Sequence, residues 1–136
     1  MIVDASVAFK WLIGEHQSPK ASQLLARDDL AAPDFIDLEL GQALSRHARQ
    51  RLITPALAER LWSETTKLPM VREPWRPLAG PALGLSLRLR ATFNDCLYLA
   101  LALSFGDVLV TADERFVRSV RTDRTLHHSI INLAEA

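Results

Sequence analysis

The chain has 136 residues, of which 49% are hydrophobic and 24% charged, and its formal net charge is zero. This composition predicts one folded domain over residues 1–136 and excludes a disordered chain. The zero net charge argues against a general polyanion-binding surface, although a local basic patch remains compatible with it. No apolar run approaches the roughly 18 to 20 residues of a membrane span, the start lacks the basic segment of a signal peptide, and the single cysteine, Cys96, cannot form an internal disulfide, so we expect a cytoplasmic protein.

The first predicted strand covers residues 1–3 and ends directly on an acid, Asp4. A strand that stops at a carboxylate places that group at the edge of a sheet, which makes Asp4 a candidate site residue. Ser6 is expected to cap the helix that follows. The apolar residues of this helix recur at helical spacing, at Val7, Ala8, Trp11 and Leu12. Residues 15–19 are polar and predict a loop whose last residue, Pro19, opens a second helix.

A second strand and a longer helix are predicted next. The strand covers residues 30–32, Pro33 stops it, and Asp34 is expected to cap the helix. The apolar face of this helix is predicted to carry Phe35, Leu38, Gly41, Gln42 or Ala43, and Leu44. Glu39 falls in the first turns, where the helix dipole favours an acid.

The middle of the chain predicts further helices and a third strand. The basic stretch from Arg46 to Arg51 reads as the end of a helix, which the dipole explains, with RNA contact as the alternative. Thr54 and Pro55 open an amphipathic helix with Leu57, Ala58, Leu61 and Trp62. Met70 and Val71 form a weak strand candidate. Residues 74–81 hold three prolines and a glycine and predict a loop before a helix that contains Leu83, Leu85, Leu87 and Leu89.

The segment from Asn94 to Phe116 organises the rest. Asp95 opens an apolar run long enough for a buried helix, and Gly106 stands where a glycine ends such a helix. Residues 108–110 predict a short buried strand, and Asp113 follows it at the start of another helix. Helices that alternate with short strands, up to a last edge strand at residues 129–133, predict an α/β protein with a mostly parallel sheet.

Four carboxylates share one edge of this predicted sheet. Asp4 and Asp113 follow strands, Asp95 begins a helix, and Glu39 lies early on another. Taken one at a time, each acid is explained as a helix cap or a first-turn acid. Together they would repel one another unless a cation compensates, and oxygen ligands without cysteine or histidine suit Mg²⁺ or Mn²⁺. Such a site activates water and stabilises the leaving oxygen in phosphodiester hydrolysis.

Four segments of the chain, in this order, resemble the pattern of PIN domains, and most closely that of VapC-type ribonuclease toxins. They are MIVDAS at the start, Glu39 in a helix after Pro33, NDCLYLALA, and LVTADERF. The resemblance implies a three-layer α/β/α sandwich and an endoribonuclease that depends on Mg²⁺ or Mn²⁺. By motif, Asp4, Glu39, Asp95 and Asp113 match the metal-holding catalytic acids. Ser6 and Thr111 are predicted to support them through their hydroxyl groups.

The same resemblance implies an RNA substrate, a homodimer, and a tight complex with a small antitoxin protein that blocks the site. Trp11, Trp62 and Trp75 are candidates for these surfaces, and at least two of them are expected to be buried instead. One departure is Asn94, where relatives often carry an aromatic residue. We expect Asn94 to affect local packing or substrate contact and not metal binding.

Other readings of the acids are weaker. A receiver domain needs adjacent acids after its first strand and a late lysine, but Ala5 follows Asp4 and no lysine occurs after Lys67. A haloacid-dehalogenase phosphatase needs a second aspartate where this chain has Ser6. No glycine-rich nucleotide-binding motif follows a strand, and Cys96 has no histidine placed to activate it. The remaining alternative is a non-catalytic module that uses the PIN fold to bind a protein or RNA, for which all four acids would not be required.

Overall fold

The computed structural model describes residues 1–14 and 19–136, and it places five strands and seven α-helices in these ranges. The strands are β1 (Ile2–Val3), β2 (Ala31–Pro33), β3 (Val71–Glu73), β4 (Leu109–Thr111) and β5 (Ile130–Asn132). The helices are α1 (Ala5–Ile13), α2 (Pro19–Leu24), α3 (Ile36–Arg49), α4 (Pro55–Glu64), α5 (Ala79–Leu89), α6 (Phe93–Phe105) and α7 (Glu114–Arg121). Most of the loop predicted at residues 15–19 lies outside the described residues. No helix in the described ranges is long and apolar enough to cross a membrane.

The five strands form one parallel sheet in the order β3-β2-β1-β4-β5. β1 lies at its centre, where Ile2 pairs with Ala31 of β2 and Val3 pairs with Val110 of β4. In this register the residue after Val3 stands beside the residue after Val110. Asp4 and Thr111 therefore meet at the carboxyl edge of the two central strands.

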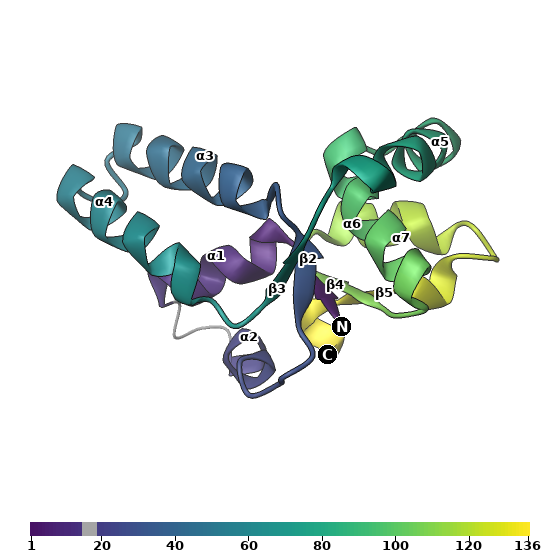
Figure 1. Ribbon diagram of the computed structural model, residues 1–136, viewed down its shortest axis with the longest axis horizontal. Coiled ribbons are helices and arrows are strands. Elements are labelled where there is room, and N and C mark those ends of the chain that lie inside the picture. Colours follow the sequence, from purple (N-terminus) through teal and green to yellow (C-terminus); the bar gives the residue numbers. More distant parts are fainter. Residues whose placement is uncertain (15–18) are drawn as a thin grey trace.

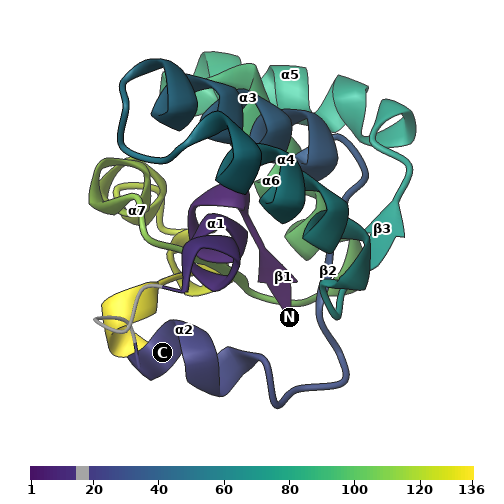
Figure 2. The same ribbon diagram turned by 90° about the vertical axis from the view of Figure 1, so that its left-hand side faces the viewer.

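Helices cover both faces of the sheet, as the α/β/α prediction requires. Figure 1 shows α1, α3 and α4 on one side of the strands and α5, α6 and α7 on the other, and in Figure 2 α1 lies below α3 and α4. The buried core fills the space between these layers and includes every residue of α6 from Cys96 to Ala102. A helix that is apolar on all sides must be covered on all sides, and α6 is covered by the sheet and by α5.

The local signals around α6 are confirmed. Thr92 caps the start of α6, and Gly106 ends it in the left-handed conformation at φ 60°. Glycine reaches this conformation without the steric clash that a Cβ causes. β4 follows directly, and the Asp113 carboxylate then caps α7 by accepting a hydrogen bond from the Phe116 N–H at 3.1 Å.

Two predicted caps are wrong. Asp4, and not Ser6, caps α1, because its carboxylate accepts from the Val7 N–H at 3.2 Å. Asp34 does not cap α3, since its carboxylate accepts from the Trp75 N–H at 3.1 Å and ties the end of β2 to the segment after β3. At α1 a neighbouring acid provides the cap in place of the predicted serine. At α3 a long-range contact uses the carboxylate that was predicted to be the cap.

The predicted apolar face of α3 is wrong in part, and the leucines of α5 do not share one face. The buried residues of α3 are Ile36, Leu40 and Leu44, while Leu38 is 63% exposed. In α5 only Ala82 and Leu85 are buried, and Leu87 is 75% exposed. Leucines two positions apart point to opposite sides of a helix, so the four leucines of α5 cannot all face the core. α5 also begins at Ala79, inside the predicted loop, because a proline in the first turn of a helix removes no helical hydrogen bond.

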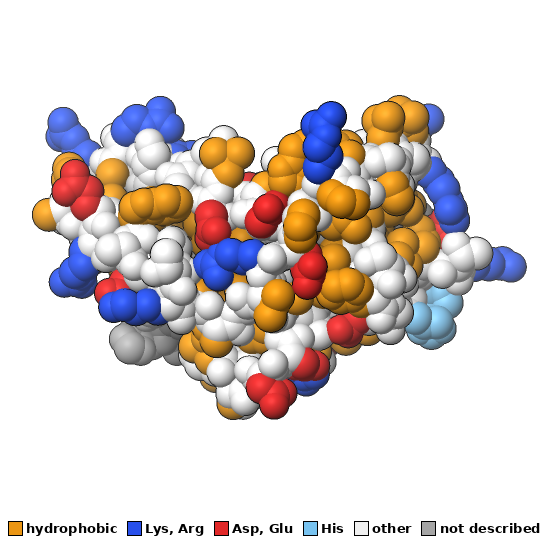
Figure 3. Space-filling view, viewed as in Figure 1, with side chains coloured by type: hydrophobic (Ala, Val, Ile, Leu, Met, Phe, Trp, Pro, Cys, Tyr) orange, Lys and Arg blue, Asp and Glu red, His pale blue; other side chains and the backbone are white. Residues whose placement is uncertain are grey.

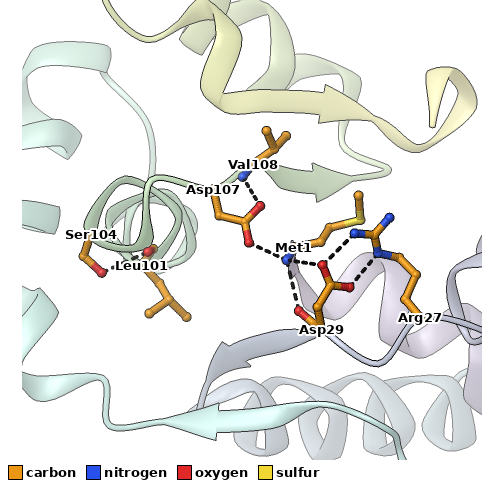
Figure 4. Close-up of polar contacts among 7 residues, drawn as sticks. All are labelled: Met1, Arg27, Asp29, Leu101, Ser104, Asp107 and Val108. Carbon is orange, nitrogen blue, oxygen red and sulfur yellow. Dashed lines mark hydrogen bonds and ion pairs between the residues drawn. The ribbon is translucent and has the colours of Figure 1, made fainter.

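The opposite edge of the sheet is fixed by the terminal amino group. The Met1 ammonium donates to the Asp29 carbonyl oxygen at 3.0 Å and forms an ion pair with Asp107 (Figure 4). Burial of Asp107 raises the pKa of its carboxyl group. The hydrogen bonds from the Met1 ammonium and the Val108 N–H outweigh this effect and hold the pKa below its ordinary value. Arg27 donates two hydrogen bonds to the Asp29 carboxylate, at 2.7 and 2.6 Å. These contacts set where β1 begins, and hence where it delivers Asp4.

Candidate active site

Asp4 is the most deeply buried acid of the described residues and stands at the centre of a hydrogen-bond network. Only 6% of its surface is exposed. Ser6 donates to one carboxylate oxygen at 2.5 Å, and the Thr111 hydroxyl donates to the other. The Ser6 hydroxyl in turn accepts from the Ala112 N–H, and the Thr111 hydroxyl from the Asp113 N–H, both at 3.0 Å. The predicted supporting roles of Ser6 and Thr111 toward Asp4 therefore have a structural basis that links β1 to the loop after β4.

Burial controls the charge of Asp4. Removal from water raises its pKa from 3.8 to about 6, against the opposing effect of hydrogen bonds from Ser6, Thr111 and Val7, and the nearby Asp95 carboxylate adds to the rise. A cation next to this position would stabilise the charged carboxylate, whereas burial without a cation favours the protonated form.

Glu39 is held from the other side of the sheet edge by two residues of α6. The Tyr98 hydroxyl donates to one Glu39 oxygen at 2.5 Å, and the Asn94 amide nitrogen lies 3.4 Å from the other. Tyr98 is almost fully buried and its ring packs against Phe35. Burial, followed by the Glu39 charge, raises the pKa of Tyr98, so its hydroxyl stays a donor. Asn94 thus contacts a candidate acid directly.

Asp95 interacts electrostatically with the other three acids. Burial raises its pKa, the Thr92 hydroxyl lowers it, and the carboxylates of Asp113 and Glu39 raise it further. Asp95 also raises the pKa of Asp4. Asp95 thus interacts electrostatically with each of the other three predicted acids. No described lysine or arginine forms an ion pair with any of the four.

The four carboxylates do not converge on a single point. Within residues 1–14 and 19–136, no three acid, histidine or cysteine side chains are placed to hold a metal ion together. The reason is visible in the hydrogen bonds, since Asp4 is turned to Ser6 and Thr111, Glu39 to Tyr98, and Asp113 to the Phe116 N–H. The donor set itself fits Mg²⁺ or Mn²⁺, because all four groups are hard oxygen ligands and two of them have raised pKa values that a cation would lower.

Cavities open on both sides of the acids. One of about 440 Å³ lies between α1 and α3, and its lining includes Ser6, Glu39, Arg46 and His47. The other, of about 260 Å³, is lined by Arg90, Ala91, Thr92, Asp95, Asp113, Arg115, Phe116 and Ser119. Basic side chains thus flank the acids at two openings, which is an arrangement suited to a polyanion that passes over a cation site.

The structure adds Tyr98 to the predicted residues and leaves Cys96 aside. A signal for Tyr98 was present, because residues three apart on a helix share a face, and Tyr98 follows Asp95 at that spacing. Its partner Glu39, 59 residues away, had no such signal. Cys96 is fully buried, and burial followed by the Asp95 charge raises the pKa of its thiol to about 11, which makes it a poor nucleophile.

Comparisons with known proteins agree with this geometry. The family model described as the PIN domain matches residues 1–121. Ribonuclease VapC3 of Mycobacterium tuberculosis is 33% identical over 120 residues, which cover 88% of this chain and 86% of that protein. Ribonuclease VapC9 of the same species is 31% identical over 120 residues, covering 85% and 87%. The crystal structure of PAE2754 from Pyrobaculum aerophilum has the same fold, with a TM-score of 0.72, 24% identity, and coverage of 98% of this chain and 88% of that one.

Proposed function

The chain belongs to the PIN-domain family, in its VapC group, and from this premise we propose that it is a divalent-metal-dependent endoribonuclease and the toxin of a toxin–antitoxin pair. The observation that carries the proposal is the buried Asp4 at the carboxyl edge of the sheet, held by two hydroxyl groups, beside Asp95, which interacts electrostatically with Asp4, Glu39 and Asp113. We propose that the whole chain acts as one nuclease domain, in the cytoplasm, where its RNA substrate is found.

In this proposal Asp4, Asp95 and Asp113 hold Mg²⁺ or Mn²⁺, with Glu39 contributing directly or through water. When bound, the ion activates water for in-line attack on an RNA phosphodiester and stabilises the departing oxygen. Ser6 and Thr111 keep the Asp4 carboxylate in one orientation, and Tyr98 does the same for Glu39. We propose that Arg46 and His47, which line the cavity beside Glu39, contact the RNA backbone.

The test is cleavage of total bacterial RNA by the purified protein with Mg²⁺, with Mn²⁺ and with EDTA, followed by mapping of the ends. Discrete cuts that require the metal are the expected result, and their positions identify the target. If protein free of antitoxin makes no cut under any of these conditions, the chain is better described as a PIN-fold binding module.

We propose that the antitoxin binds over Trp62, which is 49% exposed and packs against Gly41. Trp62 and Leu38 line a hollow of about 520 Å³ between α3 and α4. Gln42 and Arg46 line both this hollow and the cavity beside Glu39, so a partner seated on Trp62 reaches the edge of the acids. Trp11 and Trp75, in contrast, pack against the core, but they are only partly buried, whereas at least two of the three tryptophans were expected to be buried.

Trp62→Ala is expected to weaken antitoxin binding at least about tenfold, because a large aromatic side chain in a hollow dominates an interface. RNA cleavage should be unchanged, since Trp62 touches none of the four acids. Calorimetric titration with the antitoxin encoded beside the gene measures the affinity. Leu52→Ala, at an exposed leucine outside the hollow, serves as the control, and equal affinities of the two variants would place the antitoxin elsewhere.

We propose that the homodimer forms through α5 and α6. Figure 3 shows hydrophobic side chains gathered over the side of the molecule that these helices form. Leu83, Leu87 and Leu103 are exposed leucines of these two helices. Leu103 also lines a groove of about 850 Å³, together with Leu85 and Ala100. An apolar surface of this kind on a small protein marks a contact with another chain.

Leu87→Asp is expected to convert the dimer to a monomer, because a carboxylate in an apolar interface loses its water without gaining a partner. Sedimentation equilibrium gives the mass of the particle in solution. Leu25→Asp places the same charge on an exposed leucine of the loop after α2 and should leave the mass unchanged. A Leu87→Asp variant with the mass of the unchanged protein would exclude this face.

A further inference from the structure

Two arginines share the smaller cavity with Asp95 and Asp113. Arg90 follows α5 and Arg115 lies in the first turn of α7, so two segments that are distant in sequence bring guanidinium groups to one opening. The cavity beside Glu39 holds basic residues on the opposite side of the acids. If RNA is cut at the acids, as proposed above, its backbone continues past them in both directions, and the arginines stand on one of these two paths.

The backbone of Arg90 is in a conformation that arginine rarely adopts. Arg90 ends α5 in the left-handed region, at φ 54°. Helices α1 and α6 end in the same conformation with glycines, Gly14 and Gly106, both at φ 60°. A side chain here brings Cβ too close to the following carbonyl oxygen, which glycine avoids. The chain therefore keeps an arginine at a position where glycine would be more stable.

Nothing else in the described fold uses the Arg90 guanidinium. Among residues 1–14 and 19–136, neither Arg90 nor Arg115 makes a side-chain hydrogen bond or an ion pair. The neighbouring Arg88, in contrast, pairs with Asp123 and donates to the Thr125 hydroxyl at 2.8 Å. A strained backbone and a side chain without a structural task, next to the acids, together point to a ligand.

We propose that Arg90, with Arg115, holds the RNA phosphate next to the one that is cleaved, and that this contact is the reason for an arginine in a left-handed helix cap. A guanidinium group offers two parallel N–H donors to phosphate oxygens. By fixing the neighbouring phosphate, the two arginines set the position of the scissile bond over the acids, which makes them positioning residues. This inference rests on the proposed ribonuclease function.

The test compares two arginine-to-glycine substitutions that relieve the same strain. Arg51 is the second described arginine with a positive φ, at 60°, and it lies beyond the far end of α3, outside both cavities. Arg90→Gly and Arg51→Gly are both expected to raise the Tm by about 2 °C. Only Arg90→Gly should weaken RNA binding, by about tenfold. It should also make the slope of log affinity against log salt less negative by about 0.7.

Binding is measured by fluorescence anisotropy of a labelled single-stranded RNA of mixed sequence, with Asp4→Asn in every protein to prevent cleavage. Arg115→Gln, which changes no strained residue, should weaken binding similarly and leave the Tm unchanged. Equal RNA affinity of the Arg90→Gly and Arg51→Gly proteins overturns the inference while leaving the nuclease proposal intact. If the protein with both arginines binds no RNA, the proposed function fails, and this inference fails with it.

Discussion

Asp95→Asn is expected to lower the rate of RNA cleavage about a thousandfold or more while the protein stays folded. The charge of Asp95 raises the pKa of Asp4, and the charges of Glu39 and Asp113 raise the pKa of Asp95, so Asp95 is the one acid that connects the other three. A bound divalent ion contributes several kcal/mol of charge stabilisation to a phosphodiester transition state, and loss of a central ligand removes most of it. The fold should persist, because Thr92 caps α6 through the Asp95 backbone N–H, at 3.1 Å, which the substitution keeps.

A control for this experiment lies at the same edge of the sheet. Asp34 follows β2 and its carboxylate accepts from the Trp75 N–H. Asn accepts the same hydrogen bond, so Asp34→Asn should cleave RNA at the original rate. Rates are measured as single-turnover cleavage of an RNA that contains a mapped site, with circular dichroism as the check on folding. Activity retained by Asp95→Asn would remove the metal-site model.

The parts of the fold that could be predicted are those in which neighbouring residues carry the signal. A glycine at a helix end, an acid after a strand and an apolar run between them placed α6, β4 and α7 to within a residue or two, because caps and turns depend on local chemistry. The same reasoning placed all four acids at one edge, since a parallel sheet collects its carboxyl ends there.

What could not be predicted depends on contacts between distant segments. For α3 the sequence analysis predicted a face with Leu38, but Ile36 and Leu40 are buried instead, because the surface that α3 packs against decides which side of the helix is covered. The Tyr98 hydroxyl on Glu39 and the Asp34 carboxylate on Trp75 join residues more than 40 positions apart. The directions in which the acids point are set by such partners, which explains why nearness in the sheet did not make them converge.

Asp4→Asn is expected to stabilise the metal-free protein at neutral pH. The native pKa of Asp4 is about 6, above its ordinary value of 3.8, so the folded state binds a proton more tightly than the unfolded state does. The stability that this group contributes is therefore fully present below about pH 4 and is lost as the pH rises through 6. The difference between the two pKa values corresponds to about 3 kcal/mol, which is the largest gain that Asn, a neutral side chain of the same shape, can give at pH 7.

Urea unfolding in EDTA at a series of pH values measures this gain. The free energy of unfolding of Asp4→Asn relative to the unchanged protein should rise between pH 4 and 6 and stay constant above. Asn is as good a helix cap as Asp, so the hydrogen bond to the Val7 N–H is kept and does not obscure the comparison. Asp28→Asn serves as the control, because Asp28 is an exposed aspartate outside the four acids, and this variant should show no such rise.

The same pair of proteins separates repulsion from metal binding. Excess Mg²⁺ at pH 7 should raise the Tm of the unchanged protein, since a ligand that binds only the folded state stabilises it. Asp4→Asn should gain much less, because it lacks one of the proposed ligands and the charge that attracts the ion. A stability difference in EDTA that is independent of pH would mean that Asp4 is already charged in the native state. The hydrogen bonds from Ser6 and Thr111 would then offset the burial of Asp4 without a cation, and the case for a cation site beside Asp4 would fall.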